Sequence, residues 1–292
     1  MMSQEPSVST SKPAHPVPAG QIPALYRSFI RRHIHSPAEQ ILRRSAVVFA
    51  PHPDDESLGC GGTLCLKTRA GATVDLVFMT DGRNSHAKFI APRELKTLRR
   101  EEGLAAADIL GIPRQRVHHF DFEDDHLSDF LEPATKRTKE LLLNLSPEEI
   151  YIPCAFDPPR DHDATYRAVL AAVQEMEKTV TVYEYPVWFL NHWPLVRIQP
   201  RGLRQWLREA RNTIAAVSRF KRYFKCIHDV TTVLQVKSQA LCCHATQMTE
   251  WESGRNWPTL HVVADGTFLA AFFNGVECFH RYDLSGSRPS SK

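Results

Sequence analysis

The chain has 292 residues, and 42% of them are hydrophobic, which supplies enough apolar side chains for a substantial core in one or two domains. Its 36 Lys and Arg exceed its 33 Asp and Glu by only 3, so overall charge indicates no nucleic-acid partner and none is expected. Its seven cysteines include no C-x-x-C pair, and no stretch approaches the roughly 18 to 20 apolar residues of a membrane span, so a transmembrane segment is excluded and a reducing cytoplasmic setting is expected.

The first segment, residues 1–21, is expected to be a disordered tail, because it is rich in Ser and Pro and has few groups to bury. Residues 22–34 predict an amphipathic helix with Ile22, Leu25, Phe29 and Ile30 on its apolar face. Two interpretations remain open for this helix. It packs against the domain, which is the commoner case, or it makes a peripheral contact with an acidic membrane.

The next segment reads VVFAPHPDDE and begins with a predicted strand at residues 45–50. Its apolar residues do not alternate with polar ones, which is typical of a strand buried on both faces of a parallel sheet. His52, Asp54 and Asp55 follow at the carboxyl end of that strand, where open α/β sheets bind ligands. Two flanking prolines stiffen the loop. The pattern therefore predicts a preorganised site.

His and Asp are ligands for a borderline metal such as Zn²⁺, and a catalytic zinc site takes three protein groups and keeps one position open. Because Asp54 and Asp55 are consecutive, their carboxylates point apart in an extended loop. This indicates one aspartate on a metal and the other free to accept a proton from water. The residue types alone leave a plainer alternative open, a solvated loop whose aspartates cap the next helix.

A helix over residues 57–69, a strand over 74–80 and a helix over 92–110 are predicted next. The polar loop before the second helix contains His86 and is expected beside the site, where it contacts substrate or is merely solvated. Arg99 in that helix either contributes to the site or has a purely structural role, as an ion pair with Glu102 or Glu94.

The predicted strand at residues 118–122 is followed by an acidic loop, 123–126, which either holds a second metal or is solvated. A helix over 133–145 and a strand over 149–153 come next. The segment FDPPRDHDAT then opens another helix after a strand, so it should share the sheet edge with HPDDE. His162 in this segment is therefore the predicted third metal ligand.

Residues 180–189 alternate in the manner of an outer strand, and residues 190–228 are interpreted as a basic aromatic insertion. Two interpretations of this insertion remain open: it binds an anionic partner such as a sugar phosphate or a lipid-linked sugar, or it is a helix with a basic solvent face and an aromatic core face. Nine basic residues stand against the single acidic Glu209: Arg197, Arg201, Arg204, Arg208, Arg211, Arg219, Lys221, Arg222 and Lys225. The interleaved aromatic residues are Trp193, Trp206, Phe220, Tyr223 and Phe224.

A helix is predicted over residues 237–248, and residues 259–273 alternate as a strand does. Residues 285–292 form a Ser-rich tail that is expected to be disordered.

Four motifs now carry a resemblance. PHPDDE followed by SLGCGGTL resembles the (A/P)HPDDE signature of the PIG-L/LmbE-like deacetylases, zinc enzymes that remove acetyl groups from N-acetylated sugars. Residues 99–111 fit that family's R-x-x-E-x-x-x-A-x-x-x-L-G helix, residues 161–165 its DH-x-A-T segment, and residues 237–247 its K-x-x-A-L-x-x-H-x-(S/T)-Q helix. The motifs stand in the family's order across about residues 45 to 250.

The resemblance implies one Rossmann-like α/β domain over residues 22–284, with three layers, a mainly parallel sheet and a C-terminal extension. It implies one Zn²⁺, or another divalent metal, on His52, Asp55 and His162. It also assigns Asp54 as general base and Asp55 as ligand, whereas chemistry alone would allow the reverse.

The resemblance further implies that Arg99, His86 and His244 lie at the substrate, although His244 suits a packed interior position equally well. The chain departs from the family where H-P-D-H reads Pro-Arg-Asp-His, with Arg160 and Asp161 before the metal histidine. Arg160 is expected to supply positive charge to an oxyanion but cannot donate a proton at neutral pH, and Asp161 is expected to orient a neighbouring group. The general acid is then Asp54, His86 or His192.

The predicted activity is therefore metal-dependent hydrolysis of an N-acetyl group from an amino sugar or sugar conjugate, which is anionic or lipid-linked if the basic insertion binds it. Two rivals remain. One is a zinc amidase acting on another acyl group or a thiol conjugate, and the other is a non-catalytic, polyanion-binding Rossmann-like protein. The sequence leaves the oligomeric state open.

Overall fold

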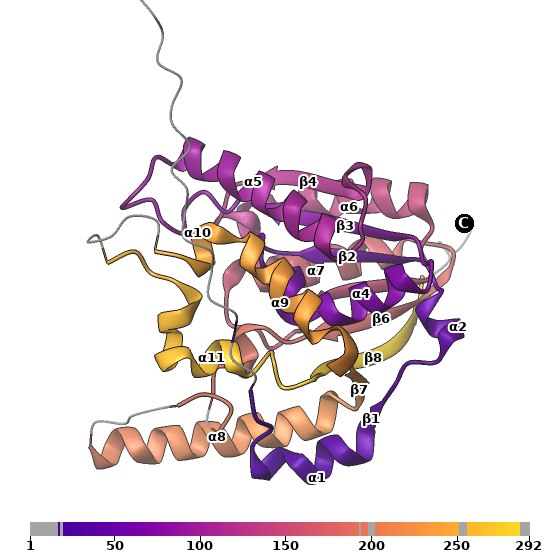
Figure 1. Ribbon diagram of the computed structural model, residues 1–292. Coiled ribbons are helices and arrows are strands. Elements are labelled where there is room, and N and C mark those ends of the chain that lie inside the picture. Colours follow the sequence, from indigo (N-terminus) through magenta and orange to yellow (C-terminus); the bar gives the residue numbers. More distant parts are fainter. Residues whose placement is uncertain (1–16, 18–19, 193, 198–201, 251–255, 287–292) are drawn as a thin grey trace, which may run out of the picture.

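The computed structural model describes residues 17, 20–192, 194–197, 202–250 and 256–286. A single eight-stranded sheet has helices on both faces (Figure 1), with the strand order β1-β7-β8-β6-β5-β2-β3-β4. The strands are β1 (Ile34–His35), β2 (Ala46–Ala50), β3 (Val74–Thr80), β4 (Val117–Phe122), β5 (Glu149–Pro153), β6 (Thr179–Tyr185), β7 (Cys226–Asp229) and β8 (Val276–Ser285). The α-helices are α1 (Ala24–His33), α2 (Glu39–Leu42), α3 (Asp55–Gly59), α4 (Gly61–Arg69), α5 (Pro92–Ile109), α6 (Leu131–Leu145), α7 (Arg160–Gln174), α8 (Leu203–Tyr223), α9 (Leu234–Cys243), α10 (Ala245–Met248) and α11 (Thr267–Ala270).

Strands β6, β5, β2, β3 and the edge strand β4 are all parallel to one another. Every residue of β2, β3 and β5 is buried, as expected for strands that are covered by helices on both faces. The predicted α/β fold with a mainly parallel sheet is confirmed. Because parallel strands end at one edge, the loops after β2 and β5 lie next to each other.

The two faces of the sheet have separate cores, which gives the three layers. One core contains Leu58, Leu64 and Ala106 from α3, α4 and α5, and the other contains Leu142 and Val173 from α6 and α7. Helices α6 and α7 also pack directly against each other on their face. This arrangement fixes the sheet edge on which the polar loops stand.

The prediction of an outer strand at residues 180–189 is wrong in two respects. Strand β6 lies between β5 and β8 and is buried at six of its seven residues, because it pairs on both sides. It ends at Tyr185, and Trp188–Leu190 form a short 3₁₀ helix instead. The apparent alternation in the sequence did not reflect solvent on one face.

The C-terminal segment also differs from the prediction. Residues 259–273 are not a strand, since they form the 3₁₀ segment Leu260–Gly266 and helix α11. Phe268, Leu269, Phe272 and Phe273 are buried at helical spacing, which explains the misleading pattern. The extension's strand is β8, which reaches Ser285, so the predicted tail at 285–292 begins inside it. Residues 287–292 of that tail and most of the predicted N-terminal tail lie outside the described residues.

A buried ion pair joins the C-terminal extension to the rest of the domain. Lys237 Nζ on α9 contacts Glu277 Oε1 on β8 at 2.7 Å and donates to the Leu58 carbonyl at 2.9 Å. The same carboxylate accepts the backbone N–H groups of Gly62 and Thr63, both at 2.7 Å, at the start of α4. The extension therefore supports the helix that follows the HPDDE loop.

Helices α1 and α8 lie side by side below the sheet (Figure 1). Tyr26 and Ile30 of α1 are buried, and the Tyr26 ring meets Phe220 of α8 edge-on at 4.7 Å. Helix 22–34 thus packs on the domain with most of its predicted apolar face, since Ile30 is buried and Phe29 packs against the core, whereas Leu25 of that face is 44% exposed. Among the described residues, no helix combines the length and apolar character needed to cross a bilayer. All seven cysteines are free thiols, and the cytoplasmic setting stays a prediction.

Candidate metal and catalytic site

The HPDDE loop and the start of α7 meet at the carboxyl edge of β2 and β5. His52 Nδ1 lies 3.2 Å from Asp55 Oδ2, and His162 Nε2 lies 3.3 Å from the same oxygen. One ligand atom from each of the three residues lies within 4.8 Å of the others. The structure therefore brings together the three residues predicted as metal ligands, although their sequence positions span 110 residues.

His162 presents an unsatisfied nitrogen to this cluster. Its side chain is fully buried, and its Nε2 atom has no hydrogen-bond partner among the described residues. Its Nδ1 lies 3.0 Å from Asp157 Oδ2, so the ring donates there and keeps the Nε2 lone pair for the cluster. A buried nitrogen without a partner is costly in a folded protein, and a cation would satisfy it.

Asp157 is the functional residue that sequence reasoning missed. Besides His162, its carboxylate accepts the backbone N–H groups of Val187 at 3.0 Å and Phe189 at 2.5 Å. A carboxylate behind a ligating histidine fixes the ring orientation and raises its basicity. The available signal was its position, four residues after the end of β5 and five residues before His162.

The donor set fits a divalent metal. Two imidazoles and one carboxylate suit zinc and several other borderline ions. Burial favours a high pKa for Asp55, but the charges and hydrogen bonds of His162 and His52 hold the pKa of its carboxyl well below the usual range. Conversely, Asp55 and Asp157 overcome burial and raise the pKa of His162 to about 9. The cluster therefore holds the Asp55 carboxylate against positive charge on the histidines. A bound cation would supply that positive charge in their place.

A second, overlapping cluster shares His52. Its Nε2 lies 3.2 Å from both Asp124 Oδ1 and Asp161 Oδ2. Asp124 belongs to the acidic loop that the sequence left open as a metal loop or a solvated one, and it is 4% exposed. Burial raises its pKa, but the hydrogen bond and charge of His52, together with the charge of Arg99 and the Asn84 N–H, outweigh burial and lower the pKa to about 2. We favour the first cluster for the metal because only it contains the unsatisfied His162 nitrogen.

Asp54 stands beside the cluster in an unusual conformation. Its φ is 128°, which is rare for a residue other than glycine, and its N–H donates to Glu56 Oε2 at 3.0 Å. The turn directs its carboxylate away from Asp55 and toward Arg99, whose Nη2 lies 3.4 Å from Asp54 Oδ2. Burial raises the pKa of Asp54 to about 7, against the lowering effect of Arg99. Such a carboxyl is poised to exchange a proton near neutral pH.

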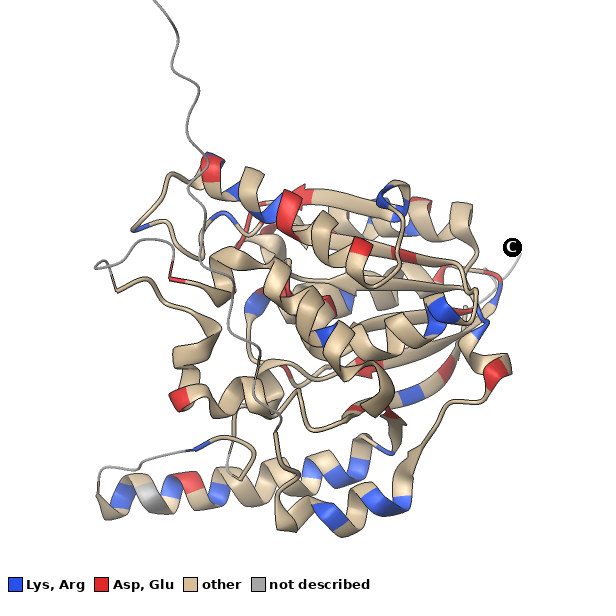
Figure 2. Ribbon diagram, viewed as in Figure 1, with Lys and Arg blue, Asp and Glu red and all other residues tan. Residues whose placement is uncertain are grey.

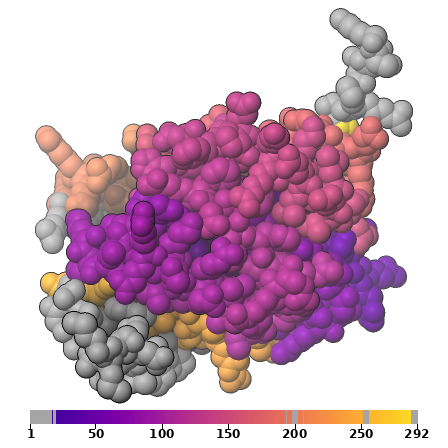
Figure 3. Space-filling model, turned by 90° about the horizontal axis from the view of Figure 1, so that it is seen from above, coloured from indigo at the N-terminus to yellow at the C-terminus, as the bar shows by residue number. Residues whose placement is uncertain are grey.

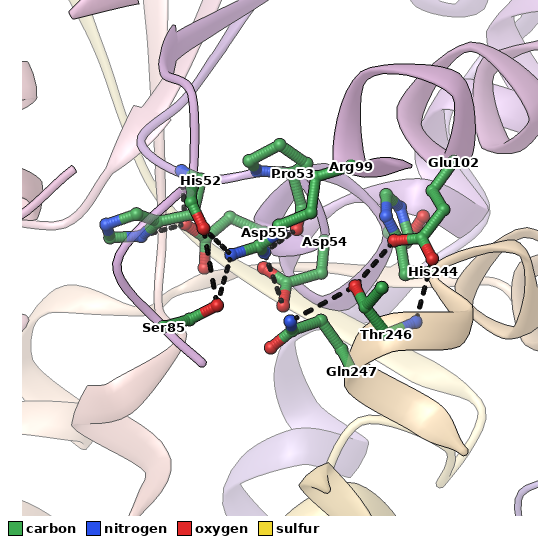
Figure 4. A network of polar contacts seen from close by, with 12 residues as sticks. His52, Pro53, Asp54, Asp55, Ser85, Arg99, Glu102, His244, Thr246 and Gln247 are labelled. Carbon is green, nitrogen blue, oxygen red and sulfur yellow. Dashed lines mark hydrogen bonds and ion pairs between the residues drawn. The ribbon is translucent and has the colours of Figure 1, made fainter. Parts of the chain in front are cut away.

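Arg99 lies under the loop and is 2% exposed. Its guanidinium donates to the carbonyls of Pro53 and, at 3.3 Å, Gly82, and to Ser85 Oγ at 3.2 Å (Figure 4). The structural alternative, an ion pair with Glu102 or Glu94, is wrong, because its acidic partner is Asp54. These contacts make Arg99 a clamp on the HPDDE loop.

His244 and its neighbours support the loop from behind. His244 is fully buried, and its Nε2 lies 2.8 Å from Glu56 Oε1. Thr246 donates through both its N–H and its hydroxyl to Glu102, each at 2.7 Å. Glu56 in turn accepts the Asp54 N–H. The structure thus places His244 in the packed position that the sequence left open, and its contacts are with Glu56 and not with an exposed surface.

The remaining predicted residues take different positions. His86 is 3% exposed, stacks on Trp257 with ring centroids 4.2 Å apart and meets the Pro258 carbonyl at 2.8 Å. Asp161 accepts the backbone N–H groups of Asp125 at 2.8 Å and Leu127 at 3.1 Å, and it faces His52 and not His162. Arg160 is exposed at the first turn of α7, with no contact to the cluster among the described residues.

Of the two histidines that the sequence left open as general acid, His86 and His192, the second has other partners. Both ring nitrogens of His192 are engaged elsewhere, with the Tyr26 hydroxyl at 2.8 Å and the Phe189 carbonyl at 2.7 Å. His192 therefore belongs to the packing between α1 and the domain and is not the acid.

Comparison with known proteins gives three results. The family described as PIG-L: GlcNAc-PI de-N-acetylase matches residues 47–173. A probable N-acetyl-alpha-D-glucosaminyl L-malate deacetylase 2 of Bacillus cereus is 32% identical over 148 residues, which are 47% of this chain and 64% of that relative, less than two thirds of its length. Two solved structures share the fold at low identity.

The first is N,N'-diacetylchitobiose deacetylase from Pyrococcus horikoshii, with a TM-score of 0.53 and 18% identity over 90% of this chain and 94% of that one. The second is 4-carboxy-2-hydroxymuconate hydratase from Pseudomonas putida, with a TM-score of 0.52 and 17% identity over 85% and 99%. At these identities the two structures establish only the fold, which hosts more than one reaction. The matched segment contains every ligand of the cluster described above, and over these residues the chain is similar to the PIG-L: GlcNAc-PI de-N-acetylase family.

Proposed function

We propose that the protein is a metal-dependent deacetylase that hydrolyses the N-acetyl group of an amino sugar or sugar conjugate. The observation that carries the proposal is the cluster of His52, Asp55 and His162 with the unsatisfied His162 nitrogen and the high-pKa Asp54 beside it. The family match and the named activity of the Bacillus cereus relative support the choice of an acetamide substrate.

We propose one zinc ion per chain on these three residues. When bound, it supplies a Lewis acid that polarises the acetamide carbonyl and acidifies a water molecule. Asp157 holds His162 in the orientation that keeps Nε2 available. Asp54 accepts the proton of the attacking water and passes it to the departing amine, so one carboxyl acts first as base and then as acid.

Arg99 and the His244–Glu56 pair act on Asp54 in this proposal. Arg99 contacts the Asp54 carboxylate and the Pro53 carbonyl, and Glu56 holds the Asp54 N–H. Together they keep the strained φ of Asp54 that directs its carboxylate. Arg160 and Asp161 remain proposed contributors, the first as positive charge near the oxyanion and the second by holding His52 and the acidic loop. His86 remains a proposed wall of the substrate site.

The decisive test is metal-dependent acetate release. Purified protein is stripped with a chelator, reloaded with Zn²⁺ and incubated with N-acetylglucosamine conjugates, and free acetate is measured. We expect activity only after reloading, and we expect His162→Ala to lose both the metal and the activity. Acetate release that ignores the chelator would overturn the proposal.

The two rivals give different outcomes in the same assay. A zinc amidase for another acyl group or a thiol conjugate would bind the metal but leave acetamides intact. A polyanion-binding protein would ignore the chelator and lose affinity when the arginines of α8 are replaced.

We further propose that the substrate is lipid-linked or lies at an anionic membrane, and the surface of helix α8 supports this. Leu203, Leu207 and Ile214 share one helical face and are 72%, 54% and 71% exposed. Arg204, Arg208 and Arg211 are exposed next to this face. Figure 2 shows basic residues along both α8 and α1, and the start of α8 projects from the body of the molecule (Figure 3).

The aromatic side of α8 follows the plainer interpretation of the insertion, since Phe220 and Phe224 are buried in the core. The exposed apolar stripe of Leu203, Leu207 and Ile214 beside the arginines is a feature that the plainer interpretation does not explain. Such a stripe is typical of helices that lie in a membrane interface. Residues Arg201 and Trp193, and the side chain of Trp206, are outside the described part of the chain.

Vesicle sedimentation tests this surface. We expect the protein to sediment with vesicles containing phosphatidylglycerol but not with pure phosphatidylcholine, and we expect Leu207→Ser to weaken the binding. Leu143→Ser is the matched control, because Leu143 on α6 is 55% exposed and lies in a different helix. Equal loss in both variants, or no sedimentation of the wild type, would contradict a membrane role for α8.

A further inference from the structure

A second group of metal-binding side chains lies on β1 and β7, in a part of the sheet that the catalytic site does not use. His35 ends β1 and stands opposite His228 in the parallel pairing with β7. Cys226 precedes His228 by two residues in β7, so both side chains project from the same face of the strand. The sheet register therefore gathers His35, Cys226 and His228.

The donor atoms of this group converge. Cys226 Sγ lies 3.4 Å from His228 Nε2, and the rings of His35 and His228 have centroids 5.2 Å apart. One ligand atom from each residue lies within 4.8 Å of the others. A tetrahedral zinc with the usual bond lengths separates its sulfur and nitrogen ligands by about 3.5 Å. The thiol and imidazole are already at that separation.

Each imidazole is also oriented by a partner at its other nitrogen. His228 Nδ1 meets Thr63 Oγ1 at 3.1 Å, and His35 Nδ1 meets the His33 carbonyl at 3.1 Å. Donation from Nδ1 leaves both Nε2 lone pairs for the group, and outer partners of this kind are typical of metal-bound histidines. Neither contact is needed by the catalytic site.

We propose that His35, Cys226 and His228 form a second divalent-cation site, with zinc as the ion that a thiolate and two imidazoles suit best. Cation binding replaces the Cys226 thiol proton, which passes to solvent, and forms one sulfur and two nitrogen bonds. Three protein ligands leave a fourth position.

The surroundings define what occupies that position. The three residues line an open pocket of about 670 Å³ that also contains Arg222, Lys225, Arg281 and His280. A bound cation beside these basic groups favours an anionic fourth ligand, which the pocket's own charges also attract.

This site is separate from the catalytic one. Strand β8 is antiparallel to both β6 and β7, so β7 runs in the same direction as β6 and the parallel core. Cys226 begins β7 and therefore lies toward the amino-terminal edge of the sheet, whereas His52 follows the carboxyl end of β2. Because neither cluster uses a ligand of the other, the second site does not depend on the deacetylase proposal.

Cobalt spectroscopy distinguishes the two sites, because only the second contains a thiol. Metal-free full-length protein is titrated with Co²⁺, and the near-ultraviolet absorption of a thiolate-to-cobalt charge transfer is recorded. We expect this band in the wild type and in His162→Ala, and we expect its complete loss in Cys226→Ser. Cys243→Ser is the matched control, since Cys243 is a half-buried thiol on α9 outside the group.

His35→Gln provides a second variant that should leave folding intact, because His35 is exposed at the end of a two-residue edge strand. We expect this variant to weaken Co²⁺ binding, measured from the concentration at which the charge-transfer band is half-developed, by at least about tenfold, because a metal ligand is lost. Absence of the band in the wild type at saturating Co²⁺ would overturn the proposal. So would a band that persists in Cys226→Ser or disappears in Cys243→Ser.

Discussion

Asp157→Asn isolates the carboxylate that orients His162. Asp157 accepts three donors, His162 Nδ1 at 3.0 Å and the N–H groups of Val187 at 3.0 Å and Phe189 at 2.5 Å. An asparagine amide has one oxygen and one NH₂ group in place of two acceptor oxygens. Whichever way it turns, its NH₂ faces a donor, so at least one of the hydrogen bonds is lost.

The expected cost falls mainly on metal binding. Replacing the outer partner of a ligating histidine typically weakens metal affinity by about 10- to 100-fold, which corresponds to about 1.4 to 2.7 kcal/mol. A further loss of about 1 to 3 kcal/mol in the free energy of unfolding is expected, because a buried donor is left unpaired.

The affinity is measured by competition for Zn²⁺ with a chromogenic chelator, and folding is checked by thermal unfolding. Asp163→Asn is the control, since Asp163 is an exposed neighbour whose contact is a surface pair with Arg167 at 3.6 Å. Wild-type affinity in Asp157→Asn, or an equal loss in Asp163→Asn, would refute the assigned role of Asp157.

Two further predictions concern packing and pH. Gly59→Ala is expected to destabilise the fold by about 1 to 3 kcal/mol in urea unfolding, because its methyl group would overlap the buried Tyr185 ring, whereas Gly61→Ala meets only ordinary contacts at 3.5 Å or more and should be tolerated. Equal effects of the two changes would contradict this packing. Burial, with Arg100 adding to it, lowers the pKa of His119 to about 4. The unfolded chain therefore binds its proton first, and wild-type stability should fall by about 1 to 2 kcal/mol more than that of His119→Gln between pH 7 and pH 5; parallel pH profiles would contradict it.

The sequence predicted the central fold and the place of the site because both depend on local patterns. The unbroken apolar run before His52 indicated a buried parallel strand, and two polar segments after strands had to share an edge. The same logic brought His162 to His52 and Asp55, which are more than 100 residues earlier in the chain.

Other features depend on contacts that no local pattern encodes. Asp157 matters because the chain turns after β6 and directs the N–H groups of Val187 and Phe189 at it. His244 supports Glu56 through a contact across 188 positions. The cluster on β1 and β7 exists only because these two strands, which lie far apart in the chain, pair with each other.

The aromatic pattern of residues 259–273 misled for a related reason. The buried apolar residues Phe268, Leu269, Phe272 and Phe273 suit a helical turn as well as they would suit a strand, and only the packing of α11 decides between the two.

The central claim is that Asp54 moves the proton at a metal centre held by other residues. Its most direct test is the rate of acetate release by zinc-loaded Asp54→Asn beside the zinc-loaded wild type, with metal content measured on the same samples. We expect unchanged zinc content and a fall in kcat of at least about 100-fold, as for the loss of a general base. A near-normal kcat in Asp54→Asn, or loss of the zinc together with the activity, would contradict it.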